Sequence, residues 1–371
     1  MAPKLKAAPP ATNPHIKTLA PYPPGKPIEE VKRQFGLDSV IKLASNENPL
    51  GPSPRALKAM AAAAAEMNLY PDGLGFYLKA ALAARLGVEP EELVLGAGSD
   101  EIVTFLALAY LSPRRELITS NYAFVRYVMA AQLAGARATL VPMRDMKHDL
   151  SAIAGAIGPQ TAMVCLDIPC NPTGTIVTRR ELTRFLNKVP PEVIVLLDQA
   201  YFEFAEHDAE YPDGLALRER FANLVVTRTF SKSYGLAGLR IGYGVARPEI
   251  IGDLDRVRSP FNASRIAQIA ALAALGDKAH LRKTVANNRR GIAQFEKGFK
   301  ALGLKSWPTW ANFILVQIGR DGPETFNELL KLGVVTRPMA GYGLIDFLRI
   351  SIGTPEENKR CLAALQQVLK K

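Results

Sequence analysis

One lysine stands where packing alone does not explain a charged side chain. Lys232 lies between Ser231 and Ser233 in the stretch RTFSKSYGLAGLRIGYG, after the apolar run NLVVTRTF, which is typical of a buried strand. Burying an ammonium group costs free energy unless the group is used, and burial lowers its pKa. Arg240 follows in the same stretch and would lower that pKa further by charge repulsion. Such a lysine is suited to form a Schiff base with an aldehyde.

Other polar residues follow apolar runs in the same part of the chain. Asp198 ends the run EVIVLLD, and Tyr201 comes soon after it. Asn171 begins NPTG after the run TAMVCLDI, and the small residues of VLGAGSDE precede a helical pattern in which Ser99 and Asp100 are candidate N-caps. Each could be an ordinary cap or turn residue. A buried carboxylate, however, must be paired or used, and backbone N–H groups at a helix start bind anions.

Together these residue types match one cofactor. A lysine can hold an aldehyde, a buried carboxylate can hold the proton of a pyridine nitrogen, and a helix start with hydroxyls and a guanidinium can hold a phosphate. Pyridoxal phosphate needs all three, and few other ligands do. We therefore expect Ser231 and Arg240 to contact its phosphate and Lys232 to hold its aldehyde. We expect no metal site, because the three cysteines show no metal-ligand spacing.

The pattern along the chain predicts strands that alternate with helices. Short apolar runs such as ELITS, ATLVPM and TAMVCLDI are separated by helical patterns such as TRRELTRFLNKV. This alternation indicates an α/β fold with a parallel sheet covered on both faces, whose ligands collect at the carboxyl ends of the strands. Since 371 residues exceed the usual size of one core, we expect several parts. These are an N-terminal arm (1–20), a larger domain (66–261) and a smaller domain from both ends (21–65 and 262–371).

The composition favours a cytoplasmic protein that acts on anionic small molecules. The formal net charge is +11, yet the basic residues are spread along the chain and do not interleave with aromatic residues, so we expect no nucleic-acid partner. No apolar run reaches the roughly 18 residues of a membrane span, and the first residues lack an apolar signal core. The odd number of cysteines (Cys165, Cys170 and Cys361) favours reduced thiols.

Several motifs together resemble one enzyme family. The stretches SNENPLGPSP, CNPTGT, DQAY and TFSKSYGLAGLRIGY are similar to those of the histidinol-phosphate aminotransferase branch of the fold-type I aminotransferases. PYPPGKPIEEV, LYPDG and RISIGT extend the match over nearly the whole chain after about residue 20. Gln199, where the family usually has glutamate, and NYAFVRY, where it more often has Pro-Thr-Tyr, depart from the pattern. The resemblance implies a mostly parallel seven-stranded sheet between helices, a smaller α+β domain and bound pyridoxal phosphate.

The resemblance also implies roles for individual residues around the cofactor. Lys232 would bind it and move the substrate proton, Asp198 would pair with the ring nitrogen, and Tyr122 would stack on the ring face. Asn171 and Tyr201 would hydrogen-bond the ring oxygen. The residues implied to bind the phosphate are Ala97, Gly98, Ser99, Ser231, Arg240 and, across the interface of a homodimer, Tyr70 of the neighbouring subunit.

The residues around the substrate leave alternatives open. The resemblance implies that Arg349 binds an α-carboxylate in a bidentate fork, and that Tyr22 and Asn48 line the substrate pocket. Turn packing beside prolines would explain Tyr22 and Asn48 almost equally well. Arg337 is either a packing residue beside Pro338 or a second cation that binds a substrate phosphate.

The predicted reaction is transamination between an amino donor and a 2-oxo acid by ping-pong kinetics, with histidinol phosphate and 2-oxoglutarate as the expected substrates. An aromatic amino-acid aminotransferase would need no second cation, and a decarboxylase of an amino-acid phosphate would use the same fold. A cofactor-binding regulator would usually carry a DNA-binding module as well, and 371 residues leave no room for one.

Overall fold

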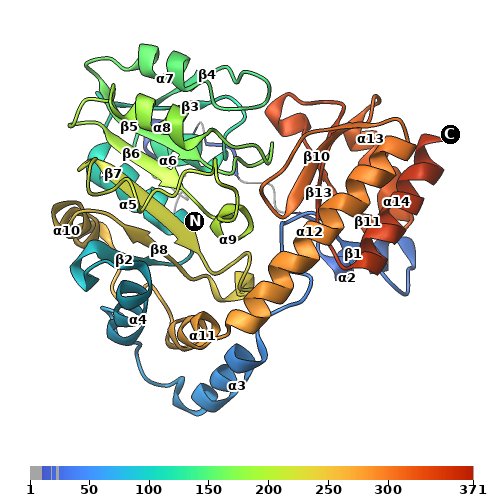
Figure 1. Ribbon diagram of the computed structural model, residues 1–371, viewed down its shortest axis with the longest axis horizontal. Helices are drawn as coiled ribbons and strands as arrows, with labels where there is room; N and C mark the ends of the chain where they lie inside the picture. The colour runs from blue at the N-terminus through green and yellow to red at the C-terminus, as the bar shows by residue number, and fades with distance from the viewer. Residues whose placement is uncertain (1–10, 18, 22–24, 371) are drawn as a thin grey trace, which may run out of the picture.

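A seven-stranded sheet forms the centre of the larger part of the molecule (Figure 1). The computed structural model describes residues 11–17, 19–21 and 25–370. The strand order is β2-β8-β7-β6-β5-β3-β4, in which β8 runs antiparallel to both neighbours and the other pairs are parallel. The strands are β2 (Leu93–Gly96), β3 (Glu116–Ser120), β4 (Arg137–Val141), β5 (Thr161–Asp167), β6 (Ile194–Asp198), β7 (Leu224–Thr229) and β8 (Gly242–Val245). The predicted α/β fold with a mostly parallel sheet is confirmed.

Helices cover both faces of this sheet because its central strands are apolar on both sides. Along β5, Cys165 packs into one hydrophobic cluster with α5, α6 and α10, whereas Val164 and Leu166 pack into another with α7 and α8. Successive side chains of a strand point to opposite faces, so a fully apolar run needs two helical layers. The helices are α4 (Phe76–Leu86), α5 (Ser99–Tyr110), α6 (Arg126–Leu133), α7 (Leu150–Ala156), α8 (Arg179–Leu186), α9 (Phe202–Ala205) and α10 (Pro248–Val257).

A smaller α+β part is built from both ends of the chain (Figure 1). Its antiparallel sheet has the order β12-β13-β10-β9, and β1 pairs in parallel with β11 beside it. The strands are β1 (Ile41–Lys42), β9 (Lys305–Ser306), β10 (Phe313–Gln317), β11 (Val334–Val335), β12 (Arg337–Pro338) and β13 (Phe347–Ser351). The helices are α2 (Ile28–Phe35), α13 (Gly322–Lys331) and α14 (Pro355–Leu369). The long helix α12 (Lys278–Ala301) runs between the two parts.

Two helices favour different domain boundaries from the expected ones. Ala56 of α3 (Pro54–Ala63) and Ala267 of α11 (Arg265–Leu275) belong to one apolar cluster with Leu93 and Val245 of the large sheet. Boundaries at 65/66 and 261/262 would assign both helices to the smaller part, so their packing favours moving them to the larger one. The remaining short elements are α1 (Pro14–Lys17), η1 (Ala64–Glu66), η2 (Pro90–Glu92), η3 (Ala237–Leu239) and η4 (Ala340–Tyr342).

Within the described residues, no helix combines the length and the apolar character needed to cross a membrane.

Candidate active site

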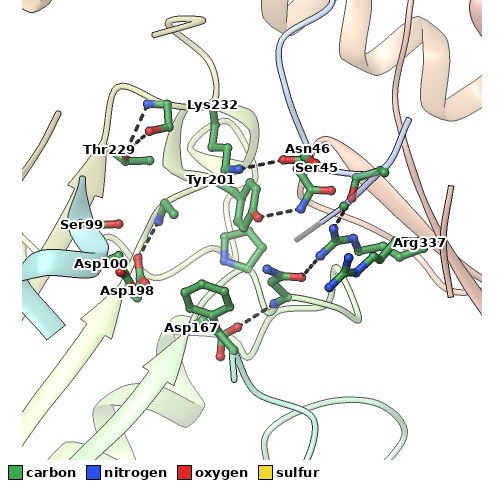
Figure 2. Close-up of a pocket in the computed structure, with 18 of the residues that line it drawn as sticks. Ser45, Asn46, Ser99, Asp100, Asp167, Asp198, Tyr201, Thr229, Lys232 and Arg337 are labelled. Carbon is green, nitrogen blue, oxygen red and sulfur yellow. Dashed lines mark hydrogen bonds between the residues drawn. The ribbon is translucent and has the colours of Figure 1, made fainter. Parts of the chain in front are cut away.

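A cavity lies where the carboxyl ends of β5, β6 and β7 face the smaller part of the molecule (Figure 2). Parallel pairing brings the last residues of neighbouring strands together, as in the register partners Asp167 and Asp198. The cavity is therefore lined by polar residues from segments that lie far apart in sequence. The predicted site residues among its lining are Ser99, Asn171, Asp198, Tyr201, Ser231, Lys232, Arg240, Arg337 and Arg349.

Lys232 reaches across this cavity from the turn after β7. Its Nζ donates a hydrogen bond to the backbone oxygen of Ser45 at 3.1 Å and lies 5.9 Å from the ring centroid of Tyr201 (Figure 2). Burial first, and then the positive charges of Arg349 and Arg240, lower the pKa of Lys232 to about 8. The sequence predicts the effect of Arg240 on this pKa but not that of Arg349. The amine is therefore partly neutral near physiological pH, as a nucleophile requires.

Asp198, the last residue of β6, is a buried carboxylate with few donors around it. Its Oδ2 accepts a hydrogen bond from the hydroxyl of Tyr127 at 3.1 Å, and its Oδ1 accepts the backbone N–H of Ala200 at 3.1 Å. Burial first, and then the negative charge of Asp167, raise the pKa of Asp198 to about 7. A cationic N–H group bound beside it would keep this carboxylate ionised. Tyr127 escaped the sequence analysis because it is one of several large residues in an ordinary helical pattern.

The start of α5 lies at the cavity, where the N-terminus of a helix offers backbone N–H groups to an anion. Gly98 is the N-cap at φ 83°, whereas the sequence predicted Ser99 or Asp100 as the cap. A Cβ at Gly98 would lie 2.5 Å from Nη2 of Arg240, so only glycine leaves this space open. Arg240 donates to Oγ of Ser231 at 3.3 Å and to the backbone oxygen of Ala97 at 3.4 Å. Backbone N–H groups, hydroxyls and a guanidinium thus meet at one helix N-terminus.

An asparagine that the sequence analysis missed lies beside Tyr201. Nδ2 of Asn46 donates to the Tyr201 hydroxyl at 2.8 Å, and Asn46 lines the cavity at φ 56° (Figure 2). Asn48, which was predicted instead, directs its amide to the backbone oxygen of Ser233 at 2.9 Å and is not among the cavity-lining residues. The left-handed backbone at Asn46 turns its side chain inward, and SNENP carries two asparagines with no local signal to distinguish them.

Two arginines from the smaller sheet close one side of the cavity. Arg337 of β12 and Arg349 of β13 are direct partners across antiparallel strands, so their side chains share one face of that sheet. Both line the cavity. Arg349 is 9% exposed and donates to Oδ1 of Asn171 and, at 2.6 Å, to the backbone oxygen of Ala44. The pairing favours the interpretation of Arg337 as a second site cation.

Of the two aromatic residues in the turn between β3 and α6, Phe124 lines this cavity, whereas the predicted Tyr122 lines an adjoining one. Phe124 lines the cavity and meets the ring of Tyr127 edge to face at 5.8 Å. Tyr122 packs instead against the cluster of Met339 and Phe347. The two positions have the same parity in NYAFVRY, but they lie in a turn between β3 and α6, where strand alternation does not apply. This position favours Phe124 over Tyr122 as the residue nearer to a ring bound in the cavity.

Tyr70 does not line this cavity. Tyr70 is 80% exposed and stacks on Phe261 with ring centroids 4.8 Å apart, away from the cavity of its own chain. Tyr22 lies outside the described residues.

The residues that line the cavity fit pyridoxal phosphate. The glycine turn at the start of α5 provides donors for a phosphate, and Asp198 is a buried carboxylate that a protonated ring nitrogen would satisfy. Lys232 is an amine with a lowered pKa that lies in the same cavity. These are the three groups that the sequence analysis required.

Comparisons with known proteins agree with this arrangement. Residues 38–365 match the family model for aminotransferase class I and II. The chain is 52% identical to histidinol-phosphate aminotransferase of Moorella thermoacetica over 95% of this chain and 92% of the relative. It is 48% identical to that of Anaeromyxobacter sp. over 97% of this chain and 99% of the relative.

A solved structure is similar over the whole fold. Histidinol-phosphate aminotransferase from Sinorhizobium meliloti in complex with pyridoxal-5′-phosphate superposes with a TM-score of 0.90 at 29% identity, covering 98% of this chain and 99% of that one. With its fold, its cavity residues and these similarities taken together, the chain belongs to the histidinol-phosphate aminotransferases, within aminotransferase class I and II.

Proposed function

We propose that this protein transfers the amino group of histidinol phosphate to 2-oxoglutarate, with pyridoxal phosphate as its cofactor, in histidine biosynthesis. The observation that carries the substrate assignment is the cross-strand pair of Arg337 and Arg349 on one wall of the cavity. An α-amino acid with an apolar side chain needs one cation for its carboxylate. A phosphorylated amino alcohol carries a phosphate of up to two negative charges in place of the carboxylate, and a dicarboxylic acid carries two carboxylates, so each offers two negative charges to the arginine pair.

The arginine pair suits both half-reactions. In the first, a guanidinium binds the phosphate of histidinol phosphate, and in the second the pair binds the two carboxylates of glutamate or 2-oxoglutarate. One rigid sheet face then serves both substrates in turn, which is consistent with ping-pong kinetics. The net charge of +11 would assist the approach of both anions.

The residues that would hold the cofactor come mainly from the large sheet. The turn of Ala97 and Gly98 with Ser99, Ser231 and Arg240 would bind its phosphate. Asp198 would hold a proton against the ring nitrogen, Asn171 and Tyr201 would donate to the ring oxygen, and Phe124 would cover one ring face. When bound, pyridoxal phosphate supplies an aldehyde for the substrate amine and an electron-withdrawing ring.

Proton transfer in this site falls to Lys232. Its Nζ has a pKa of about 8, so the free amine can take the substrate's Cα proton. It can then return a proton to the cofactor carbon on the other side of the substrate nitrogen. Asp198 keeps its position through Tyr127 and the backbone of Ala200. The bond from Asn46 fixes the Tyr201 hydroxyl on the side from which Lys232 approaches.

We further propose that the protein acts as a homodimer. An exposed apolar surface runs over Met67, Leu69, Tyr70, Leu74, Phe76 and Tyr77 and includes Phe261, on which Tyr70 stacks. Exposed apolar patches of this kind favour association. A two-fold dimer would cover this surface and could place Tyr70 at the phosphate of the neighbouring subunit, as the resemblance implies.

The decisive test of the substrate is Arg337→Ala, assayed with histidinol phosphate and with phenylalanine as donors. Loss of a charged hydrogen-bonding partner should raise the activation free energy derived from kcat/KM by about 2–4 kcal/mol for the phosphorylated donor. The kcat/KM for phenylalanine should stay nearly unchanged. Arg337→Lys, which keeps the charge without the fork, should fall between wild type and alanine. Equal, small losses for both donors would move the assignment to an aromatic amino-acid aminotransferase.

Assembly can be tested by sedimentation and by subunit mixing. Tyr70→Phe keeps the exposed ring but removes the hydroxyl, whereas Lys232→Ala removes the amine. If sites are shared, a hybrid of these two inactive subunits regains one working site. A fully active monomer would contradict the dimer.

A further inference from the structure

His148 is a buried histidine that takes no part in the proposed reaction. It precedes α7, and its side chain is 2% exposed. Its Nδ1 lies 2.7 Å from Oγ of Ser120, at the end of β3. Its Nε2 lies 3.1 Å from the backbone oxygen of Asp167 and 3.3 Å from the Asp167 Oδ1. Both neighbours of Nε2 can only accept, so the proton must sit on Nε2, and the serine hydroxyl donates to Nδ1.

Asp167 links this histidine to two groups of the active site. Its Oδ2 accepts the backbone N–H of Asn171 at 2.7 Å, which the dashed line at Asp167 in Figure 2 marks. Its Oδ1 has no hydrogen-bond partner in the described part of the chain beyond the 3.3 Å contact to His148. Asp167 also lines the cavity and is the register partner of Asp198 on the neighbouring strand.

The charge of Asp167 acts on the carboxylate that would face the cofactor. After burial, this charge is the largest cause that raises the pKa of Asp198. An ionised Asp167 therefore makes Asp198 a stronger base toward a ring nitrogen. The titratable groups that face Asp167 from the surrounding elements are His148, Asp198, Tyr127, Cys165, Cys170, Tyr201 and Tyr342. Among these, the N–H of His148 and the thiol of Cys170 can donate to its carboxylate, and the N–H is the stronger donor.

A metal site is the other use for such a cluster. Ligand atoms of His148, Asp167 and Cys170 lie within 4.8 Å of one another. However, both ring nitrogens of His148 are already engaged, one with Ser120 and one with Asp167. The geometry thus favours a hydrogen-bonded relay over metal coordination.

We propose that His148 is a positioning residue that acts through Asp167. By donating from Nε2, it holds the Asp167 carboxylate in one orientation, so that one oxygen fixes the backbone of Asn171 and the negative charge lies beside Asp198, which would face the cofactor ring. His148 itself touches neither cofactor nor substrate. The inference rests on the cofactor site proposed above and is independent of which amino donor the enzyme uses.

The test compares His148→Phe, Asp167→Asn and the double variant with wild type. Asp167→Asn removes the charge but keeps an oxygen for the Asn171 N–H, and His207→Phe is a control at an exposed histidine. Three properties are measured: the affinity of the cofactor-free protein for pyridoxal phosphate, the pH midpoint of the bound cofactor's visible band, and kcat and KM separately.

Each single variant should weaken pyridoxal phosphate binding and lower kcat by about tenfold to a hundredfold, the range expected for a lost hydrogen bond to a charged group, with a smaller change in KM. The pH midpoint of the visible band should rise by about half a pH unit or more. A weaker Asp198 stabilises less positive charge on the ring nitrogen, so the Lys232 nitrogen keeps its proton to a higher pH. The double variant should be no worse than either single one. His148→Gln, whose amide can donate to Asp167, should recover part of the loss.

Two results would overturn the proposal. Full additivity in the double variant would mean that His148 does not act through Asp167. Lower thermal stability of His148→Phe with unchanged cofactor affinity and band midpoint would mean that the histidine only packs. If His148→Phe does not fold, Ser120→Ala and ring NMR of the cofactor-free wild type replace it. With only four histidines in the chain, the Nε2–H tautomer of His148 can be observed directly, and the Nδ1–H tautomer would contradict the inference. Normal cofactor binding to Lys232→Ala, by contrast, would count against the cofactor site as a whole.

Discussion

The cofactor side and the substrate side of the cavity are built in different ways. The cofactor side comes from one sheet, where the ends of β6, β7 and β2 supply Asp198, Lys232 and the glycine turn before α5. The substrate side comes from a second sheet, whose strands β12 and β13 carry Arg337 and Arg349. The chemistry therefore rests on the buried large sheet, whereas the choice of substrate rests on a separate part of the molecule. Changes on the cofactor side should affect cofactor binding and activity with every donor, whereas changes on the substrate side should affect the preference among donors.

The largest effect is expected for Lys232→Ala, which removes the group on which both half-reactions depend. Transamination should fall by at least about a thousandfold with every donor, since the covalent anchor and the proton carrier are lost together. The visible band of the bound cofactor, near about 410–430 nm, should disappear. Absorbance spectra and single-turnover assays check both. Retention of the band would place the cofactor on another amine and break the comparison.

Asp198→Asn should separate catalysis from stability on the cofactor side. Activity should fall by about a hundredfold or more, because an amide cannot hold the ring proton as an anion does. In the cofactor-free protein, the same substitution should raise the stability of the fold at high pH. The pKa of Asp198 is raised from 3.8 to about 7 by folding, so its stabilising contribution is complete below pH 4 and is lost as pH rises through about 7. Above pH 7 the cofactor-free variant should therefore melt at a higher temperature than wild type. The absence of any pH-dependent difference between the two would contradict a buried, raised carboxylate.

A smaller effect should distinguish the two aromatic candidates at the border of the two sides. Phe124→Leu should weaken cofactor binding by about 0.5–1.5 kcal/mol, the range of a lost ring contact, whereas Tyr122→Leu should change cofactor affinity little. Titration of both cofactor-free variants with pyridoxal phosphate measures the difference. The reverse order would return the stacking role to Tyr122.

The sequence predicted the cofactor side more completely than the substrate side. Lys232, Asp198 and the turn at Gly98 could be found because each follows or precedes an apolar run, and parallel strands bring such ends together. Arg337 stayed ambiguous because β12 is only two residues long, too short to show alternation, and its facing of the cavity depends on pairing with β13. Asn46 and Phe124 were missed because their directions depend on a left-handed residue and a turn. His148 gave no signal because its partners come from two other strand ends.

The hydrogen bond from the backbone of Asn46 to Oγ of Ser351 spans 305 residues and sets the order in which the site can come into being during synthesis. At roughly 5–20 residues per second, about 15–60 s pass between the addition of these two residues on the ribosome. Lys232 and the large sheet are complete well before Arg337, Arg349 and Ser351 leave the exit tunnel. A nascent chain thus carries Lys232 and Asp198 in a complete sheet before the wall with Arg337 and Arg349 exists. The segment around Asn46 must wait until Ser351 has emerged before it can close the cavity.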